Sequence, residues 1–256
     1  IKNSSNNNYV NELGGNGIYE FGSAFWNNEI EYSKFYVTRN DTANFKILRN
    51  MLQAPNATFN NDPLSIERQI KSDSPEHTWN VVLISVESFS GDYLKRFGNK
   101  ENITPYFDQF YASGTRTVRG LEALSMGIPP TPGQSIVRRP DNDDMFTMGS
   151  VLKTKGYDVH YIYGGNSFFD NMGKYFSNSG YTVLDQRDIP DSLVHLTTAW
   201  GCDDEAAFNY TLQQCDKSFN SNKPFFNHIM TVSNHRPYIY PEGRIDIDPK
   251  YQSIQG

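Results

Sequence analysis

Three short segments with strand character, each followed directly by a polar cluster, constrain the fold of this 256-residue chain more than any other feature. The segments are residues 79–86, 157–163 and 224–232, and stretches with helical spacing lie between them. Short apolar runs that alternate with helices are typical of a buried parallel sheet covered by helices on both faces. We therefore predict an α/β/α sandwich with a mostly parallel central sheet for residues 76–256.

The remaining elements follow from apolar spacing and from residues that begin or end helices. Gly156 is well placed to end one helix, and Thr104-Pro105 to begin a short one. Asp204 and Glu205 lie in the first turn of another, where the helix dipole favours acidic side chains. The predicted helices are residues 42–52, 118–126, 145–155, 168–177 and 203–219, with a further strand at 181–184.

Residues 1–75 differ in composition from the rest of the chain. The first eight residues are rich in Asn and Ser, and residues 19–36 are aromatic and acidic. Residues 54–76 carry the Pro, Asn, Asp and Ser that are typical of a linker. We expect an N-terminal arm packed on the domain rather than a second domain. Because the chain begins at Ile1, we also expect it to be a piece of a longer protein.

The charge balance argues against one class of partner, and the spacing of the cysteines bears on whether they form a disulfide. Lys and Arg total 23 against 29 Asp and Glu, and no basic stripe is present, so we expect no nucleic-acid partner. The longest aliphatic run, residues 81–84, is far short of the roughly 20 residues that span a bilayer. Cys202 and Cys215 would lie roughly 20 Å apart on one straight helix, which favours free thiols; a disulfide would need a bend between them.

The polar clusters after the predicted strands are Glu87-Ser88, residues 164–167 and Ser233-Asn234-His235. Since the carboxyl ends of parallel strands line the ligand crevice of such sheets, we expect these clusters to converge. A carboxylate at the position of Glu87 must be solvated, paired with a cation such as Arg, or bound to a metal. His235 can hydrogen-bond a phosphoryl oxygen, although a lone histidine is more often structural.

Residues 114–120 lead into the helix predicted at 118–126 and include Arg116, Thr117 and Arg119. A hydroxyl at a helix N-terminus is usually only a cap. As a nucleophile, Thr117 would benefit from the helix dipole and from free N–H groups that can bind phosphate oxygens. The two arginines can neutralise a substrate phosphate or simply be solvated. The absence of HExxH, P-loop, GxGxxG and G-x-S-x-G motifs argues against zinc proteases, common nucleotide-binding proteins and ordinary α/β-hydrolases.

Six motifs in a fixed order resemble the lipoteichoic acid synthase-like phosphoglycerol transferases of the alkaline phosphatase–sulfatase superfamily. The resemblance covers residues 79–256, with a weaker likeness at residues 16–36. The motifs are residues 80–89, 114–122, 129–135, 164–172, 199–201 together with Asp204, and 231–237.

This resemblance implies a divalent cation, with Mn²⁺ first and Mg²⁺, Zn²⁺ or Ca²⁺ as alternatives. Glu87 and Thr117 match two of its ligands, and the family's Asp-His pair would follow beyond Gly256. Thr117 also matches the nucleophile, and His235 the histidine that contacts the substrate phosphate. Residues that match the headgroup-binding region are Asn166, Phe169 and Asn171. An arginine that the synthases use there has no clear equivalent in residues 168–172, which leaves the substrate open.

The implied reaction is a ping-pong transfer of phosphoglycerol from a phosphatidylglycerol-type lipid, through a phosphothreonine, to a glycan or polymer hydroxyl. The full-length protein would be anchored in the cytoplasmic membrane and act at its extracytoplasmic, periplasmic face. Alternatives are a phosphatase or phosphodiesterase with the same site, a phosphoethanolamine transferase, or an inactive domain that senses lipid headgroups. The passage from the helix at Thr104 to the nucleophile is also short for the family, which suggests residues missing near 108–110.

Overall fold

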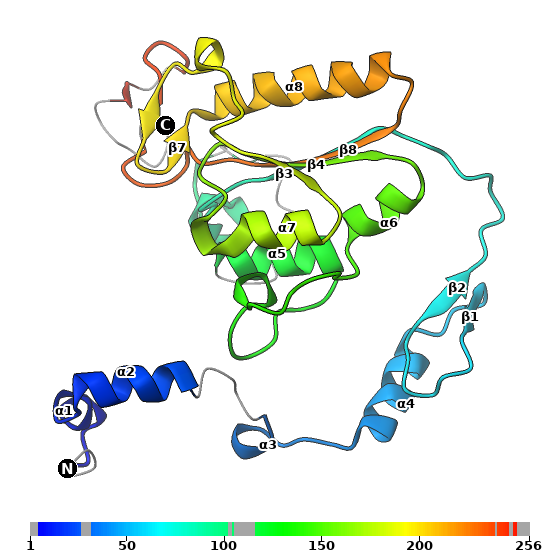
Figure 1. Ribbon diagram of the computed structural model, residues 1–256, viewed down its shortest axis with the longest axis vertical. Helices are drawn as coiled ribbons and strands as arrows, with labels where there is room; N and C mark the ends of the chain where they lie inside the picture. Colours follow the sequence, from blue (N-terminus) through cyan, green and yellow to red (C-terminus); the bar gives the residue numbers. More distant parts are fainter. Residues whose placement is uncertain are drawn as a thin grey trace. The chain divides into compact units, whose positions relative to one another are not determined.

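The computed structural model describes residues 5–26, 32–101, 104, 116–238, 240–245 and 248–249 (Figure 1). The chain divides into two compact units, Ile1–His77 and Thr78–Gly256. Each unit is described here by itself. The helix expected at Thr104-Pro105 and the residues near 108–110 fall almost wholly outside the described residues.

The second unit is built on a four-stranded sheet in the order β3-β8-β4-β5. The strands are β3 (Val81–Ser85), β8 (Phe225–Met230), β4 (Asp158–Tyr163) and β5 (Thr182–Leu184), and every neighbouring pair is parallel. Figure 1 shows helix α8 (Asp204–Asn220) on one face, with α5 (Thr117–Met126), α6 (Met148–Thr154) and α7 (Met172–Asn178) on the other. The predicted α/β fold with a parallel central sheet is confirmed.

Two apolar clusters hold the layers together, because side chains alternate between the faces of each strand. Tyr161 of β4 and Phe226 of β8 belong to the cluster that includes α5 and α7, and the rings of Tyr161 and Phe176 stack with centroids 3.7 Å apart. Ile162 and Ile229 belong to the cluster that includes the first turn of α8. The sheet is therefore buried on both faces at β4 and β8. The apolar run of β3 indicated burial, but this strand lies at the edge of the sheet and stays partly exposed.

The helix predicted over residues 168–177 is interrupted at its start. Asp170 and Asn171 adopt left-handed backbone conformations, with φ of 51° and 63°. A short 3-10 turn, η4 (Phe169–Asn171), therefore precedes α7, which begins only at Met172. Asp and Asn tolerate this conformation better than other residues with side chains. The prediction of one continuous helix was wrong for its first four residues.

The first unit contains helices α1 (Asn8–Leu13), α2 (Gly17–Trp26), α3 (Tyr32–Phe35) and α4 (Asp41–Met51). The last confirms the helix predicted over residues 42–52. The expected linker at residues 54–76 instead includes an antiparallel pair, β1 (Ala57–Phe59) and β2 (Arg68–Ile70). The guanidinium of Arg49 donates to the carbonyl oxygens of Asn60, Asp62 and Ser65. These bonds from α4 fasten the loop between the two strands.

Shorter elements complete the described part of the second unit: η1 (Gly91–Tyr93), η2 (Lys95–Phe97), η3 (Ile136–Arg138), η5 (Asp191–Leu193), β6 (Thr197–Thr198) and β7 (Gly201–Cys202). Cys202 lies in β7, ahead of helix α8, whereas Cys215 lies within that helix, and both thiols are free. Across the described ranges, no helix combines the length and the apolar character needed to cross a bilayer.

Candidate active site

Glu87 and Thr117 meet at the carboxyl end of the sheet although they are 30 positions apart. Glu87 lies two residues beyond β3, and Thr117 is the first residue of α5. The Thr117 hydroxyl donates to the Glu87 carboxylate, with Oγ1 lying 2.7 Å from Oε1 and 2.9 Å from Oε2. The N-cap position belongs to Arg116, whose backbone is extended. The Thr117 hydroxyl therefore faces a carboxylate instead of capping its own helix.

The backbone of Glu87 is held by side chains from the segment that follows β8. Its N–H donates to Thr231 Oγ1 at 3.0 Å, and its carbonyl accepts from Asn234 Nδ2 at 3.1 Å. Ser88, which has a positive φ of 52°, donates its hydroxyl to Glu87 Oε1 at 3.2 Å. These contacts fix the direction in which the Glu87 carboxylate leaves the sheet.

The two arginines near Thr117 have different surroundings. Arg116 is exposed. Arg119 forms an ion pair with Glu122 at 3.2 Å and donates a short hydrogen bond to the carbonyl of Gly133. Glu122, whose side chain is 1% exposed, also accepts from Ser135. Arg119 thus fastens α5 to the following loop, and its predicted role in substrate binding remains a prediction.

His235 and Phe169 are brought onto the same tryptophan. The His235 ring stacks on Trp200 with centroids 3.5 Å apart, and Phe169 meets Trp200 edge to face at 6.1 Å. Asn171 instead donates to the carbonyls of Val137 and Arg139, at 3.1 and 3.4 Å. The structure therefore brings together the predicted catalytic residue His235 and the predicted substrate-binding residue Phe169, and it turns the amide of Asn171 toward the loop around η3.

Asn166 is exposed, and its side-chain oxygen accepts from the N–H of Phe168 within the turn after β4.

Asp204 belongs to the family motifs, but no role was predicted for it from the sequence. The Oδ1 atom of Asp204 accepts hydrogen bonds from the N–H groups of Val232 and Ser233, at 2.7 and 3.1 Å. Burial raises the pKa of Asp204, although these hydrogen bonds act in the opposite direction. Asp204 thus ties the start of α8 to the segment that contains His235.

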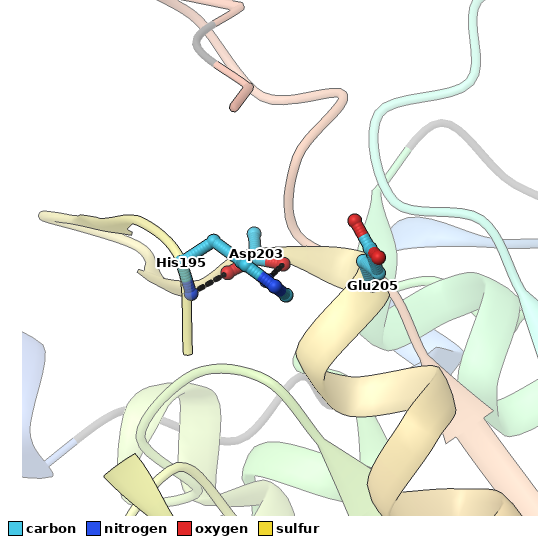
Figure 2. A group of neighbouring side chains, drawn as sticks. All are labelled: His195, Asp203 and Glu205. Atoms are coloured by element: carbon cyan, nitrogen blue, oxygen red, sulfur yellow. Dashed lines mark hydrogen bonds and ion pairs between the residues drawn. The ribbon is translucent and has the colours of Figure 1, made fainter. Parts of the chain in front are cut away.

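A separate group of side chains, His195, Asp203 and Glu205, could also hold a metal ion, since one ligand atom from each lies within 4.8 Å of the others. Figure 2 shows His195 joined to Asp203 by two hydrogen bonds, while the Glu205 carboxylate points away from both. Glu205 forms an ion pair with Arg244 at 2.9 Å. This group was not predicted from the sequence, because its members belong to no recognised ligand spacing.

Asp203 already has several partners of its own. Burial by itself would raise the pKa of Asp203, but hydrogen bonds from the N–H groups of His195, Leu196 and Ala206 outweigh it and lower the pKa. The Ala206 bond makes Asp203 the N-cap of α8. A carboxylate with these partners would lose helix-end hydrogen bonds on turning toward an ion, so Glu87 is the better placed of the two acids for catalysis.

Beside His235 the surface is hollowed. The residues that line this hollow come from the β6–β7 hairpin and the segment after β8: Leu196, Thr198, Trp200, Cys202, Asp203, Val232, Ser233, His235 and Pro237. Burial raises the pKa of the Cys202 thiol to about 11, so the thiol stays protonated at neutral pH and is a poor nucleophile. Among the residues that line the hollow, the ionisable side chains left for chemistry are therefore those of His235 and Asp203.

Comparisons with known proteins identify the family of this chain. Residues 79–254 match the sulfatase family model. Phosphoglycerol transferase I of Xanthomonas euvesicatoria pv. vesicatoria (strain 85-10) is 27% identical over 130 residues, which cover 47% of this chain and 18% of that protein. Lipoteichoic acid synthase 2 of Bacillus subtilis (strain 168) is 24% identical over 182 residues, or 65% of this chain and 27% of that one. The chain thus spans less than a third of these curated relatives.

Two solved structures share the fold. A protein of the alkaline phosphatase superfamily from Vibrio parahaemolyticus matches with a TM-score of 0.76 and 27% identity, over 88% of this chain and 57% of that chain. The lipoteichoic acid synthase LtaP of Listeria monocytogenes matches with a TM-score of 0.56 and 16% identity, over 70% of this chain and 47% of that one. The predicted superfamily is therefore confirmed, and the second match supports the fold alone.

Proposed function

Because the chain belongs to the sulfatase family of enzymes, we propose that it contributes the catalytic site of a transferase that moves phosphoglycerol from a phosphatidylglycerol-type lipid to a hydroxyl acceptor. The observation that carries this proposal is the contact between the Thr117 hydroxyl and the Glu87 carboxylate at the start of α5. The relatives named phosphoglycerol transferase and lipoteichoic acid synthase support the choice of reaction.

Thr117 is the proposed nucleophile. Its Oγ1 attacks the phosphorus of the headgroup, so that a threonine O–P bond forms as the P–O bond to diacylglycerol breaks. The proton lost by Thr117 ends on the diacylglycerol oxygen. An acceptor hydroxyl then attacks the same phosphorus, takes the phosphoglycerol and restores the threonine. The first turn of α5 offers free N–H groups and the positive end of the helix dipole to the phosphate oxygens.

The donor atoms at the site fit a divalent cation. A carboxylate and a hydroxyl are hard oxygen donors, which suit Mn²⁺, Mg²⁺ and Ca²⁺ better than a soft metal. Glu87 and Thr117 would supply two of the ion's ligands, and we expect Mn²⁺ to serve best. When bound, the ion supplies positive charge that lowers the pKa of the threonine hydroxyl and offsets the charge of the phosphate. Because acidic residues outnumber basic ones in this chain, a bound cation would also offset the repulsion between the protein and an anionic substrate.

The remaining roles follow from position. His235 and Phe169 flank Trp200, where they can contact the phosphate and the glycerol of the headgroup, and exposed Arg116 can approach the phosphate from α5. Asn166 and Asn171 are proposed to shape the turn that presents Phe169. The acceptor would be a hydroxyl of a glycan or polymer. The full-length protein would be membrane-anchored and act at the extracytoplasmic face, where such lipids and polymers meet.

The test is turnover of a fluorescent phosphatidylglycerol by the full-length protein with Mn²⁺ present. Thr117→Ala should abolish diacylglycerol release, and Thr154→Ala, which removes an exposed hydroxyl from α6, should not change it. Mass spectrometry of the wild-type protein quenched during turnover should find a glycerophosphoryl group on Thr117. Undiminished release by Thr117→Ala would refute the nucleophile. Release of glycerophosphate to water in the presence of every acceptor tried would favour a phosphodiesterase.

A further inference from the structure

The turn of the β6–β7 hairpin places Trp200 against three partners. Its ring stacks on His235 with an interplanar angle of 27°, and its edge-to-face contact with Phe169 has an angle of 87°. Its indole N–H donates to the carbonyl of Arg236 at 2.9 Å. Phe169 follows β4 and His235 follows β8, so a single side chain connects residues from the ends of two different strands.

The main chain at Trp200 is held by close backbone contact with the turn after β4. A Cβ added at Gly201, whose φ is +143°, would lie 2.1 Å from the carbonyl oxygen of Gly164, and one added at Gly165 would lie 2.5 Å from that of Trp200. The N–H of Cys202 donates to the Gly164 carbonyl at 2.9 Å. Only glycine allows this approach, so the position of the tryptophan is set by its backbone as well as by its ring.

The Arg236 carbonyl also favours one tautomer of His235. His235 Nδ1 lies 3.3 Å from this carbonyl oxygen, which already accepts from the Trp200 indole. Because a carbonyl oxygen can only accept, this contact favours the tautomer of the neutral ring with the proton on Nδ1. Nε2 is then the nitrogen left for a ligand, and the stacked indole fixes the plane in which it lies.

We infer that Trp200 is a positioning residue that fixes the ring plane and the tautomer of His235 and joins this histidine to Phe169. Its catalytic meaning rests on the proposed function, in which His235 contacts the transferring phosphate. The inference that Trp200 orients His235 does not rest on the proposed function, because it concerns only the contact between these two side chains. Trp200 belongs to the sequence motif at residues 199–201, but no role was predicted for it from the sequence. The sequence feature that could have indicated this role is an aromatic residue directly before a glycine.

A spectroscopic experiment on the full-length protein tests the pair without relying on turnover. The protein is labelled with 5-fluorotryptophan, and the ¹⁹F resonance that disappears in Trp200→Phe is assigned to Trp200. The frequency of this resonance should change in His235→Gln, because the imidazole ring that stacks on the indole is then lost. A resonance left unchanged by His235→Gln would overturn the inference.

Kinetics test whether this placement matters for transfer. Trp200→Leu removes the ring, and we expect kcat to fall about 10- to 100-fold with KM little changed, since small misplacements of reacting groups carry costs of this size. Trp200→Phe keeps a ring face but lacks the indole N–H, so it should lose less. Trp26→Leu, at an exposed position of α2, is the matched control and should match the wild type. Wild-type kcat in Trp200→Leu would overturn the positioning role.

The two experiments separate the failure of this inference from failure of the proposed function. If the wild-type protein releases no diacylglycerol under any condition, the proposed transferase fails, and the ¹⁹F measurement still decides whether Trp200 holds His235. If transfer occurs, Trp200→Leu leaves kcat unchanged and the Trp200 resonance does not respond to His235→Gln, the function stands and the inference falls.

Discussion

Glu87 and Asp203 are both partly or fully buried acids at element ends, yet they are held in opposite ways. Among the described residues, the Glu87 carboxylate receives hydrogen bonds from the side-chain hydroxyls of Thr117 and Ser88, while its backbone is fixed separately by Thr231 and Asn234. The Asp203 carboxylate receives three backbone N–H groups. Hydroxyl partners can turn toward a ligand without unfolding anything, whereas backbone partners cannot. This difference supports the proposed catalytic role of Glu87 and indicates a structural role for Asp203.

The most direct test of this difference replaces each acid with its amide, which removes one negative charge from each site. Glu87→Gln should lower the rate of diacylglycerol release at least about 10³-fold, because it weakens both the cation site and the contact with the nucleophile. Asp203→Asn should keep the rate within about threefold, since the amide can still cap α8. Turnover by the full-length protein is the measurement. Equal losses in the two variants would mean that Asp203 is also part of the catalytic machinery.

Cation binding should separate the same two sites. Mn²⁺ at 100 times its Kd should stabilise the wild-type protein by about 2.7 kcal/mol, measured as a rise in Tm on thermal unfolding. This rise should vanish in Glu87→Gln and persist in His195→Ala, which removes the only imidazole from the alternative group. The reverse pattern would place the ion at His195, Asp203 and Glu205 and would contradict the assignment to Glu87 and Thr117.

Stability should respond in the opposite order to activity. Asp203→Ala should lower the free energy of unfolding by about 2 kcal/mol, because it removes the cap of α8 and leaves buried N–H groups without an acceptor. Glu87→Gln in the absence of metal should change the free energy of unfolding by less than about 0.5 kcal/mol, since hydroxyls can donate to an amide oxygen as well. A larger loss in Glu87→Gln would show that this acid, too, supports the fold.

The smallest expected effect is a change in the stability contributed by Asp203 at low pH. The pKa of Asp203 is lowered in the folded chain, so its contribution to stability is present above the unfolded pKa of about 3.9 and is lost as the pH falls through the lower folded value. The stability gap between the wild type and Asp203→Asn should therefore narrow as the pH falls below about 4. Thermal unfolding across pH 3–6 measures this gap. A gap independent of pH would mean that the hydrogen bonds of Asp203 do not depend on its charge.

The fold was largely predictable because the period of apolar residues is a local property. Strands β3, β4 and β8 follow from runs of Val, Ile, Tyr and Phe, and the convergence of Glu87 with the segment around His235 follows from parallel strands ending at one edge. The break at Asp170 and Asn171 was missed because helical spacing continues through it. Only a backbone preference for the left-handed region, which these residue types share, signalled it.

Contacts between distant residues account for the other differences. Nothing near residues 57–70 indicates that Arg49 would bind three carbonyls of their loop, and nothing near Arg119 indicates its bond to Gly133. The role of Trp200 depends on glycines in two separate turns that permit backbone contact. Such arrangements are properties of the folded chain. They explain why the contact between Glu87 and Thr117 was predictable by position while the side chains that support it were not.

Asn234 has a consequence for how this enzyme could be switched off. Its side chain holds the carbonyl of Glu87, and the next residue along is His235. One short segment therefore supports the residue proposed to activate Thr117 and includes the histidine proposed to contact the phosphate. A compound that displaced this segment from the sheet would impair both proposed roles at once without occupying the proposed lipid site. An inhibitor of that kind would not have to compete with the proposed lipid substrate.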